Sequence, residues 1–320
     1  MADRVPSLGT LGFGGANLGN LFTAMSDEQA NAVLEAAWEQ GIRYFDTAPH
    51  YGLGLAERRL GRFLAGKPRD EFVVSTKVGR LLVPSPETSD EWDEEGGFVV
   101  PADPRRVWDA SADGVRRSLD DSLERLGLDR VDVLFLHDPD EYEDMEGSVR
   151  SAVPALVGLR EEGLVRAVGI GSKSVAAHLA GLRVGDLDLL MVAGRYTLLE
   201  QPAAPALIPE CRDRGIGIVV AGAFNSGLLS TSTPGPGAHY EYGEAPADVV
   251  AKAQRLAAVC AGYGVDLPTA ALQFPLREPA VRAIALGATE PAHVEQNVRR
   301  LAEPVPDELW KQLVAEGLLP

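Results

Sequence analysis

The sequence has 320 residues, of which 45% are hydrophobic, and its 47 acidic residues against 30 basic ones leave a net charge of −17 at pH 7. A chain of this size and apolar content can bury a large core, but its negative charge disfavours binding to nucleic acid or to anionic membranes, which are polyanions. The longest apolar stretch, which begins at Gly215, is too short to span a bilayer.

The two cysteines and the N-terminal segment favour a cytoplasmic protein. Cys211 and Cys260 lie far apart in the sequence and outside any CxxC pair, so we expect two buried free thiols rather than a disulfide or a redox site. The N-terminal segment lacks the apolar region of a signal peptide. Neither observation indicates an oligomeric state.

The chain alternates between short apolar segments and longer amphipathic ones. The short segments are rich in β-branched and aliphatic residues, as is typical of strands that are buried on both faces. They span residues 11–15, 42–47, 72–77, 131–137, 165–171, 187–192, 217–222 and 281–287.

The longer segments have the periodicity of helices. Residues 27–40 place Glu28, Glu35 and Glu39 opposite an apolar face made by Ala30, Val33, Leu34 and Ala37. Residues 105–126 mix spacings of three and four, which predicts one helix whose buried face contains Trp108, Ala112, Val115, Leu119, Leu123 and Leu126.

Eight units of strand followed by helix, with no linker between them, predict one α/β domain over residues 1–320, a closed (β/α)8 TIM barrel. A doubly wound open sheet is the alternative, because periodicity does not distinguish the two. Residues 80–104 and 224–247 interrupt the alternation and are expected to be long loops. They follow strands, so in a barrel they would form a lid or pocket wall at the C-terminal face, or else exposed disordered loops.

Polar side chains stand at the ends of three consecutive predicted strands. Asp46, Lys77 and His137 end the second, third and fourth strands, and Tyr51 lies in the loop after the second. In a barrel these four would share one mouth. Lys77 would lower the pKa of the Tyr51 phenol, Asp46 would balance the charge of Lys77, and His137 would orient a substrate oxygen. This set suits proton transfer at an oxygen while a nicotinamide cofactor carries the electrons.

These residues resemble the aldo-keto reductases, through DTAPHYG (46–52), the lysine that ends VVSTK (73–77) and the histidine that ends LFLH (134–137). The resemblance covers nearly the whole chain. It implies a (β/α)8 barrel and an NAD(P)-dependent oxidoreductase with Asp46, Tyr51, Lys77 and His137 as its catalytic tetrad. It also implies that Tyr51 is the general acid/base and that hydride passes directly between nicotinamide and substrate.

Two further segments, 193–201 and 223–230, resemble the sugar and pyridoxal dehydrogenases of that family. The resemblance implies oxidation of a cyclic aldose, of the L-fucose, L-galactose or D-arabinose type, at C1 to a lactone. Pyridoxal oxidation and NADPH-dependent reduction of aldehydes or ketones are alternatives. A barrel that binds nucleotide without catalysis is a further one, although such a protein would have no need of Tyr51.

The resemblance also implies the residues that hold the cofactor, and it favours NAD over NADP. Ser172 would contact the carboxamide, whereas the glutamine usual after the next strand is replaced by Ala193 or Gly194. The segment 285–297 would bind the adenosine phosphate, and it lacks the Lys and Arg that pair with the 2′-phosphate of NADP. The expected contacts are Ser172, Gly222, Phe224, Asn225, Gly287, Thr289, His293, Gln296 and Asn297.

Four residues are candidates for binding the substrate: Asn17, His50, Trp92 and Arg195. The segment GFGGANLG near the N-terminus is not a dinucleotide fingerprint, because Asn17 stands where GxGxxG requires its third glycine. Neither HxH nor HExxH occurs in the sequence, so a metal-dependent hydrolase is disfavoured and no metal site is expected.

Overall fold

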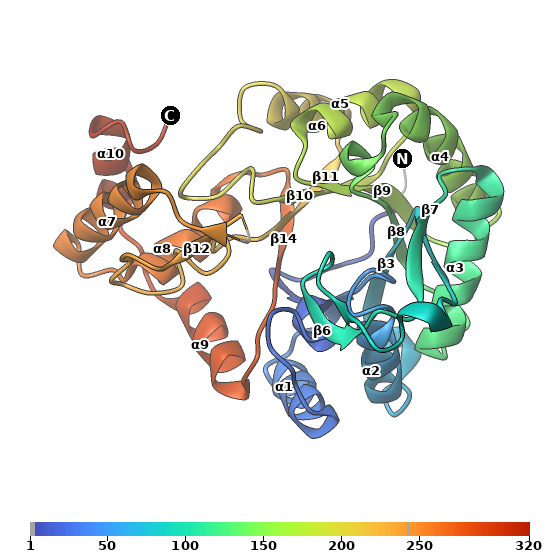
Figure 1. The fold of residues 1–320 in the computed structure, drawn as a ribbon. Helices are drawn as coiled ribbons and strands as arrows, with labels where there is room; N and C mark the ends of the chain where they lie inside the picture. The colour runs from blue at the N-terminus through green and yellow to red at the C-terminus, as the bar shows by residue number, and fades with distance from the viewer. Residues whose placement is uncertain (1–3, 242) are drawn as a thin grey trace.

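The computed structural model describes residues 4–241 and 243–320, and in them eight parallel strands close into a barrel (Figure 1). Each of the eight predicted strand segments contains or overlaps one barrel strand. The strands are β1 (Leu11–Gly14), β2 (Tyr44–Asp46), β3 (Val73–Val78), β8 (Val133–His137), β9 (Ala167–Ser172), β10 (Leu189–Ala193), β11 (Gly217–Ala221) and β14 (Val281–Leu286).

Closure of the sheet decides between the two folds that the sequence allowed. Strand β1 pairs in parallel with β2 on one side and with β14 on the other, so the sheet has no edge. The expectation of a (β/α)8 barrel is therefore confirmed, and the open doubly wound sheet is wrong.

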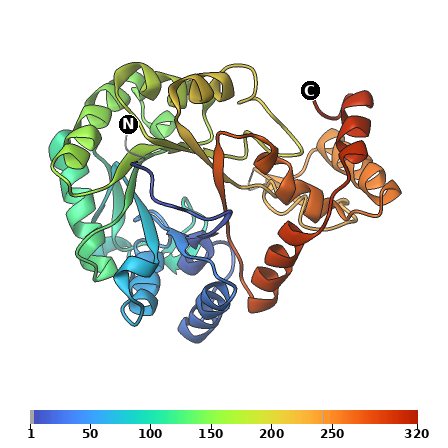
Figure 2. The same ribbon diagram turned by 180° about the vertical axis from the view of Figure 1, so that it is seen from behind.

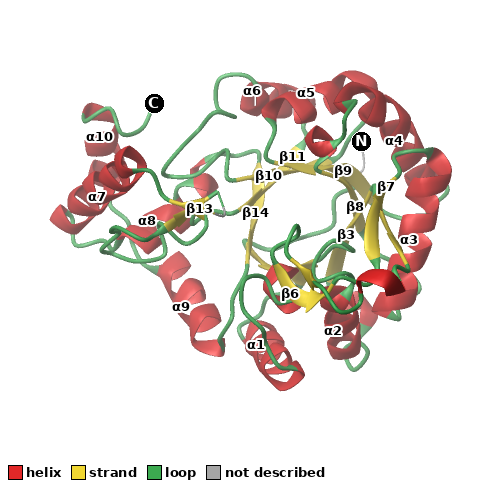
Figure 3. Cartoon of the chain, viewed as in Figure 1, coloured by secondary structure: helices red, strands yellow, loops and turns green. Residues whose placement is uncertain are grey.

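Helices cover the outside of the barrel, as the red ribbons around the yellow strands show (Figure 3). Three of them, α7, α8 and α10, lie together at one side and enclose a second apolar cluster that includes Leu256, Ala270 and Leu313. The helices are α1 (Asp27–Glu39), α2 (Leu55–Leu64), α3 (Ala112–Leu126), α4 (Met145–Glu161), α5 (Val175–Val184), α6 (Leu207–Arg214), α7 (Ala247–Gly262), α8 (Leu267–Gln273), α9 (Pro291–Ala302) and α10 (Asp307–Ala315).

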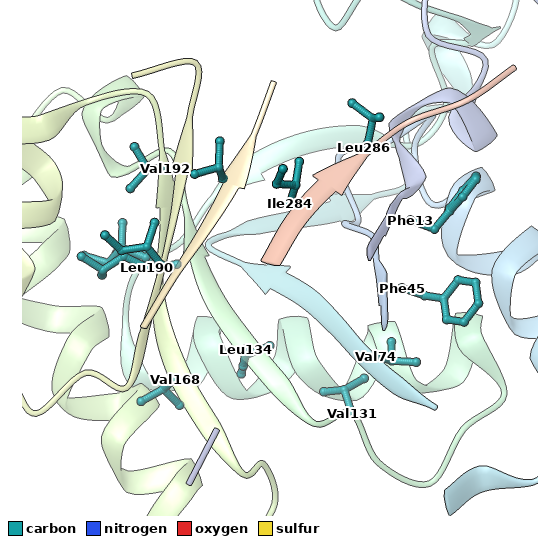
Figure 4. Packing of buried hydrophobic residues seen from close by; sticks show 14 of the residues in the cluster. Phe13, Phe45, Val74, Val131, Leu134, Val168, Leu190, Val192, Ile284 and Leu286 are labelled. Carbon is teal, nitrogen blue, oxygen red and sulfur yellow. The ribbon is translucent and has the colours of Figure 1, made fainter. Parts of the chain in front are cut away.

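Alternation along each strand divides the core into two parts, because successive side chains point to opposite faces of a sheet. Residues such as Phe45, Val74 and Leu134 point outward to the helices (Figure 4). Their neighbours fill the barrel and pack with Leu8, from the N-terminal stretch that crosses the barrel in the view from behind (Figure 2). These inward residues are Tyr44, Val133, Phe135, Ala167, Leu189, Met191, Val219, Ala283 and Ala285.

The predicted helix over 105–126 is wrong in its first part. Residues Arg105–Trp108 form strand β7, which pairs antiparallel with β4 (Arg80–Val83), and α3 starts only after Ser111 caps the amide of Gly114. Trp108 is 39% exposed and stacks on Arg80 instead of joining the buried face of a helix. Of the other residues on that predicted face, Val115, Leu119 and Leu126 are buried and Leu123 is half-buried, but Ala112, in the first turn of α3, is exposed.

The two expected long loops contain structure of their own. In the first, β5 (Trp92–Asp93) pairs with β6 (Phe98–Pro101), and in the second β12 (His239–Tyr240) pairs with β13 (Gly243–Glu244). Position 242, inside the second segment, lies outside the described residues. The expectation of disordered loops is therefore wrong for these paired stretches.

Two further sequence expectations concern thiols and membranes. Cys211 and Cys260 are both buried and free, as expected. Over residues 4–241 and 243–320, the apolar stretches of the helices fall short of what a bilayer crossing requires.

Candidate active site

Three of the four predicted catalytic side chains meet because they point into the barrel from neighbouring strands. Asp46 lies two residues after the inward Tyr44, and His137 lies two residues after the inward Phe135. Lys77 pairs in register with Phe135 across β3 and β8. All three side chains are buried, with exposed fractions of 3% for Asp46, 2% for Lys77 and 6% for His137.

Lys77 is the centre of this group. Its Nζ donates to Asp46 Oδ2 at 2.7 Å, to the carbonyl of Thr47 at 3.0 Å and to Tyr51 Oη at 3.0 Å. Ser75 donates to the second oxygen of Asp46 at 2.6 Å. Each hydrogen of the ammonium therefore has an acceptor, and Asp46 is held by two donors.

The Tyr51 loop is shaped by two glycines in the left-handed region, where side chains are unfavourable. Gly52 has φ 58° and Gly54 has φ 80°. A Cβ on Gly52 would lie 2.2 Å from the carbonyl oxygen of Gly19, so only glycine allows the loop to approach η1 (Gly15–Gly19). This approach places Tyr51 over the strand ends.

Burial has the larger effect on the phenol. It raises the pKa of Tyr51 to about 12, while the Lys77 ammonium opposes that rise. The expectation that Lys77 lowers the pKa is right in the direction of its own effect, but the net pKa is raised because the desolvation of a buried phenolate outweighs one nearby cation. The pKa of Lys77 is lowered by burial and raised by Asp46 and Tyr51, and its net value lies above the ordinary one, so this side chain stays charged.

His137 has a partner that sequence reasoning missed. Arg80, the first residue of β4, places Nη1 2.8 Å from His137 Nδ1. Burial, Arg80 and Lys77 together hold the pKa of His137 well below its usual range, so the imidazole is neutral. The available signal is an arginine three residues after Lys77, at the start of the segment 80–104 that the sequence predicts to be a loop.

His50, a candidate substrate residue, lies beside the tetrad. Its ring centroid is 5.6 Å from that of His137 and 6.0 Å from that of Tyr51. Within the described part of the chain, its buried Nδ1 has no hydrogen-bond partner. Burial, followed by nearby cations of which Arg80 is the strongest, lowers the pKa of His50 to about 2. A neutral ring with an unsatisfied nitrogen suits a polar substrate group.

The β5–β6 hairpin supplies the wall of the site through Phe98 rather than Trp92. The Phe98 ring lies 5.3 Å from His50 and 6.1 Å from Tyr51, whereas Trp92 is 61% exposed. Arg106 holds the hairpin with two bonds of 2.6 Å to Asp93 and donates to the His50 carbonyl at 3.0 Å. Neither Phe98 nor Arg106 was singled out from the sequence.

The other two expected substrate residues have different surroundings. Asn17 lies so close to Gly287 that a Cβ on this glycine would be 2.3 Å from its Oδ1, which places Asn17 next to an expected cofactor residue. Arg195 donates to Glu241 at 2.8 Å and to Glu200 at 3.2 Å. Glu241 also accepts from Lys173 at 2.9 Å, so Arg195 helps to tie the β12–β13 hairpin to the barrel mouth.

The expected cofactor residues at the end of β9 and just after β11 form part of the same mouth. The Ser172 hydroxyl donates to Asp140 and accepts from the amide of Ser174. Gly222 and Asn225 both have positive φ, and Phe224 between them is half-buried. Within the described residues, Asn225 Oδ1 is buried without a partner, while its Nδ2 donates to Glu200 at 3.0 Å. The free oxygen fits a ligand donor such as an amide.

The remaining expected cofactor residues lie at α9 and just before it. Thr289 Oγ1 and His293 Nδ1 are 3.3 Å apart on the surface, Gln296 is half-buried and Asn297 is buried. Glu290 precedes the helix without capping it through its side chain. Pro291 has no amide hydrogen and the amide of His293 donates to the carbonyl of Glu290 at 3.1 Å, so the first turn offers an anion the amide of Ala292 and the positive end of the helix dipole. These features fit the adenosine phosphate of a nicotinamide cofactor, with Gly287 leaving room beside them.

Comparison with known proteins agrees with this geometry. Residues 10–316 match the model of the aldo/keto reductase family. The chain is 53% identical over 311 residues to a D-threo-aldose 1-dehydrogenase of a Pseudomonas species, covering 97% of this chain and 94% of that protein. It is 39% identical over 332 residues to a pyridoxal 4-dehydrogenase of Microbacterium luteolum, with the same shares covered.

Among solved structures, the chain superimposes on the holo form of an aldo-keto reductase from Bacillus halodurans with a TM-score of 0.74. The two chains are 25% identical, and the match covers 97% of this chain and 92% of that one. Together with the match of nearly the whole sequence to the family, this similarity confirms the resemblance found in the motifs. The chain belongs to the aldo/keto reductase family and is an oxidoreductase that uses a nicotinamide cofactor.

Proposed function

We propose that the protein is an aldose 1-dehydrogenase, which oxidises the cyclic form of an aldose at C1 to a lactone with NAD. The observation that carries this proposal is the hydrogen bond of 3.0 Å from Lys77 Nζ to Tyr51 Oη, next to a neutral His137. In this proposal Tyr51 takes a proton and His137, whose ring centroid is 5.8 Å from that of Tyr51, holds the oxygen. The 53% identity to a D-threo-aldose 1-dehydrogenase supports the substrate class.

In this reaction Tyr51 acts as the base. As phenolate it takes the proton of the anomeric hydroxyl, the C1–H bond breaks, and the oxygen and C1 form the carbonyl of the lactone. Bound NAD supplies the hydride acceptor and a positive charge that favours the phenolate. Lys77 stabilises the phenolate, and Asp46 keeps Lys77 in place. His137 donates a hydrogen bond to the oxygen and orients C1.

The charge around α9 supports NAD over NADP. No Lys or Arg occurs between residues 285 and 297, and the exposed Glu290 and Glu295 lie near or in the first turns of the helix. A 2′-phosphate at this position would meet negative charge instead of the bidentate arginine that such phosphates favour. His293, which is exposed in the first turn of α9, is therefore the position where a cationic side chain should improve the binding of NADP.

Pyridoxal oxidation is the second candidate, because the chain is 39% identical to a pyridoxal 4-dehydrogenase over most of both chains. The same tetrad would take the proton from the substrate hydroxyl. The two candidates differ in the pocket, where an aldose offers several hydroxyls and pyridoxal offers one aromatic ring to Phe98 and His50.

A substrate screen distinguishes these candidates. The purified protein is mixed with NAD or NADP and with L-fucose, L-galactose, D-arabinose or pyridoxal, and reduction of the nicotinamide is followed by absorbance. We expect rapid reduction of NAD with one of the sugars and release of a lactone. Turnover of pyridoxal alone would select the second candidate. If none of the four substrates reduced the nicotinamide and the protein reduced simple aldehydes with NADPH, both candidate functions would be replaced by that of a carbonyl reductase.

A further inference from the structure

The contact between Arg80 and His137 restricts which nitrogen of the imidazole carries the proton. Arg80 Nη1 is 2.8 Å from His137 Nδ1, and the Arg80 side chain is 2% exposed. A guanidinium has only donors and stays protonated in proteins. Nδ1 must therefore accept, and a neutral ring then carries its hydrogen on Nε2.

A second contact favours the same tautomer. The carboxylate oxygen Oδ2 of Asp138 lies 3.3 Å from His137 Nε2. A negative charge near Nε2 favours a hydrogen at that nitrogen, while a positive charge near Nδ1 excludes one there. The positive charge is at Nδ1 and the negative charge is near Nε2, so both favour the same tautomer.

We propose that Arg80 is a positioning residue that holds His137 as the Nε2–H tautomer, so that this ring presents a hydrogen-bond donor to the reacting oxygen. The inference deepens the proposed function and rests on it for the identity of that oxygen, the anomeric hydroxyl of an aldose. That oxygen would accept a hydrogen bond from Nε2 of His137. A ring with its hydrogen on Nδ1 would instead present a lone pair, which cannot stabilise the developing carbonyl oxygen.

The guanidinium of Arg80 is itself fixed from several sides. Its Nη2 donates to Asp138 Oδ2 at 3.0 Å and to Glu141 Oε2 at 2.8 Å. Its plane lies over the Trp108 ring at 4.2 Å, and Arg80 and Trp108 are partners in the β4–β7 ladder. Trp108 packs at 4.5 Å on Tyr142. A guanidinium with this much support has little freedom to release Nδ1.

The backbone conformation of Asp138 also supports a role for its carboxylate next to Arg80 and His137. This residue follows His137 directly and has φ 40°, in the left-handed region that is unfavourable for residues other than glycine. Its amide donates to the carbonyl of Gly171 at 2.8 Å. The unfavourable conformation brings the carboxylate within reach of both Arg80 and His137.

The charged surroundings of the ring explain why it stays neutral. Lys77, Arg80, Arg106 and the neighbouring His50 all lower the pKa of His137, after burial, which has the largest effect. Asp138 is the acidic group within ion-pair distance of the ring among the described residues. Removing the cation at Nδ1 would leave Asp138 free to stabilise an imidazolium, so Arg80 fixes the tautomer and also adds to the effect of burial that keeps the ring neutral.

The first test is the tautomer itself, measured without substrate. Long-range ¹H–¹⁵N spectra distinguish a protonated ring nitrogen from an unprotonated one, and a His137→Gln variant assigns the signals. In the wild-type protein we expect Nδ1 of His137 to be unprotonated and Nε2 protonated from pH about 5 to about 9. A hydrogen on Nδ1, or an imidazolium within this range, would overturn the proposal whatever the substrate is. Failure of sugar oxidation with the expected tautomer would overturn only the proposed function.

The second test removes the donor. Arg80→Met should lower kcat for the best substrate about tenfold to a hundredfold, with little change in KM, and should add a loss of activity at low pH as His137 begins to protonate. Arg80→Lys, which retains one cationic donor, should recover part of the loss.

Arg125→Met is the control, because Arg125 pairs with the buried Glu57 at 2.6 Å outside the barrel. Unchanged kcat and an unchanged pH profile in Arg80→Met would contradict the proposal. Should that variant fail to fold, the wild-type spectra and Arg80→Lys still decide.

Discussion

Asp46 and Lys77 form a buried ion pair, with 2.7 Å between Oδ2 and Nζ, at the ends of two neighbouring strands. The pair uses one hydrogen of the ammonium and leaves the others for the Thr47 carbonyl and for Tyr51 Oη. A charge that would be costly in the barrel core is thereby balanced, and it stands next to the phenol that it has to influence.

Removal of the phenolic hydroxyl should abolish oxidation without loss of cofactor binding. Tyr51→Phe is expected to lower kcat about 10²- to 10⁴-fold, because the proton acceptor is lost while the ring still packs on Phe98. Fluorescence titration with NAD checks binding, and the exposed Tyr263→Phe is the control. Turnover at the wild-type rate would show that Tyr51 is not the base.

Replacement of Lys77 should change both stability and the pH dependence of oxidation. Lys77→Met leaves the Asp46 carboxylate buried without its cation, at a cost of about 3–5 kcal/mol in the free energy of unfolding. It also removes the charge that opposes the rise in the pKa of Tyr51, so the remaining activity should require a higher pH than in the wild type.

Urea unfolding and rate measurements against pH check both effects. The double variant Asp46→Asn/Lys77→Met should recover stability but not activity, because no charge is then left unpaired. A pH profile of Lys77→Met that superimposes on the wild-type profile would mean that Lys77 does not affect the phenol.

The approach of Gly52 to Gly19 should be indispensable for the position of Tyr51. Gly52→Ala puts a Cβ 2.2 Å from the Gly19 carbonyl oxygen at φ 58°, so the loop must move and kcat should fall. Gly127→Ala is a matched control, with φ 62° and no atom within 4 Å of the added Cβ. It should cost only the conformational penalty, about 1–2 kcal/mol by urea unfolding. Equal kcat values in the two variants would rule out the proposed role of the close approach.

Stability should fall as the pH drops below about 6.5, because buried histidines resist protonation. His178 is buried, and desolvation lowers its pKa from 6.5 to about 4 in the folded protein. Between these values the unfolded chain binds the proton and the folded protein does not. Stability from this residue is therefore complete above pH 6.5 and is lost as the pH falls towards 4, at about 1.4 kcal/mol per pH unit.

Urea unfolding at several pH values measures this slope. His178→Gln should reduce it by the contribution of one proton, whereas the exposed His239→Gln serves as the control. A slope that is the same in His178→Gln as in the wild type would show that this histidine is not neutral in the fold.

A cation at position 293 should improve the use of NADP. His293 is exposed in the first turns of α9, near the uncapped helix start. His293→Arg offers two donors to a 2′-phosphate and should raise kcat/KM for NADP about tenfold, with little change for NAD. Glu295→Arg is the control for added positive charge on the same helix. If both variants raised kcat/KM for NADP equally, the effect would come from the added positive charge of the helix and not from a specific contact with the 2′-phosphate.

The strand segments and the four candidate catalytic residues could be predicted from the sequence alone. Each barrel strand is a short apolar segment that can be recognised from its own residues. Asp46, Lys77 and His137 lie at or near strand ends, where the parallel strands of a barrel converge. Whether they share one mouth depended on closure of the sheet, which the pairing of β1 with both β2 and β14 shows. The motifs added the family, which the comparisons confirm.

The tertiary structure decided what depends on contacts between distant segments. The sequence predicts Arg80 in a loop and Trp108 in a helix. In the structure the two residues pair across the short strands β4 and β7. The pKa of Tyr51 also could not be read from the presence of Lys77, because burial and the ammonium have opposite effects and only the packing shows that burial is the larger. Periodicity reports which face of an element is apolar, but it carries no information on which side chain from another element lies against that face.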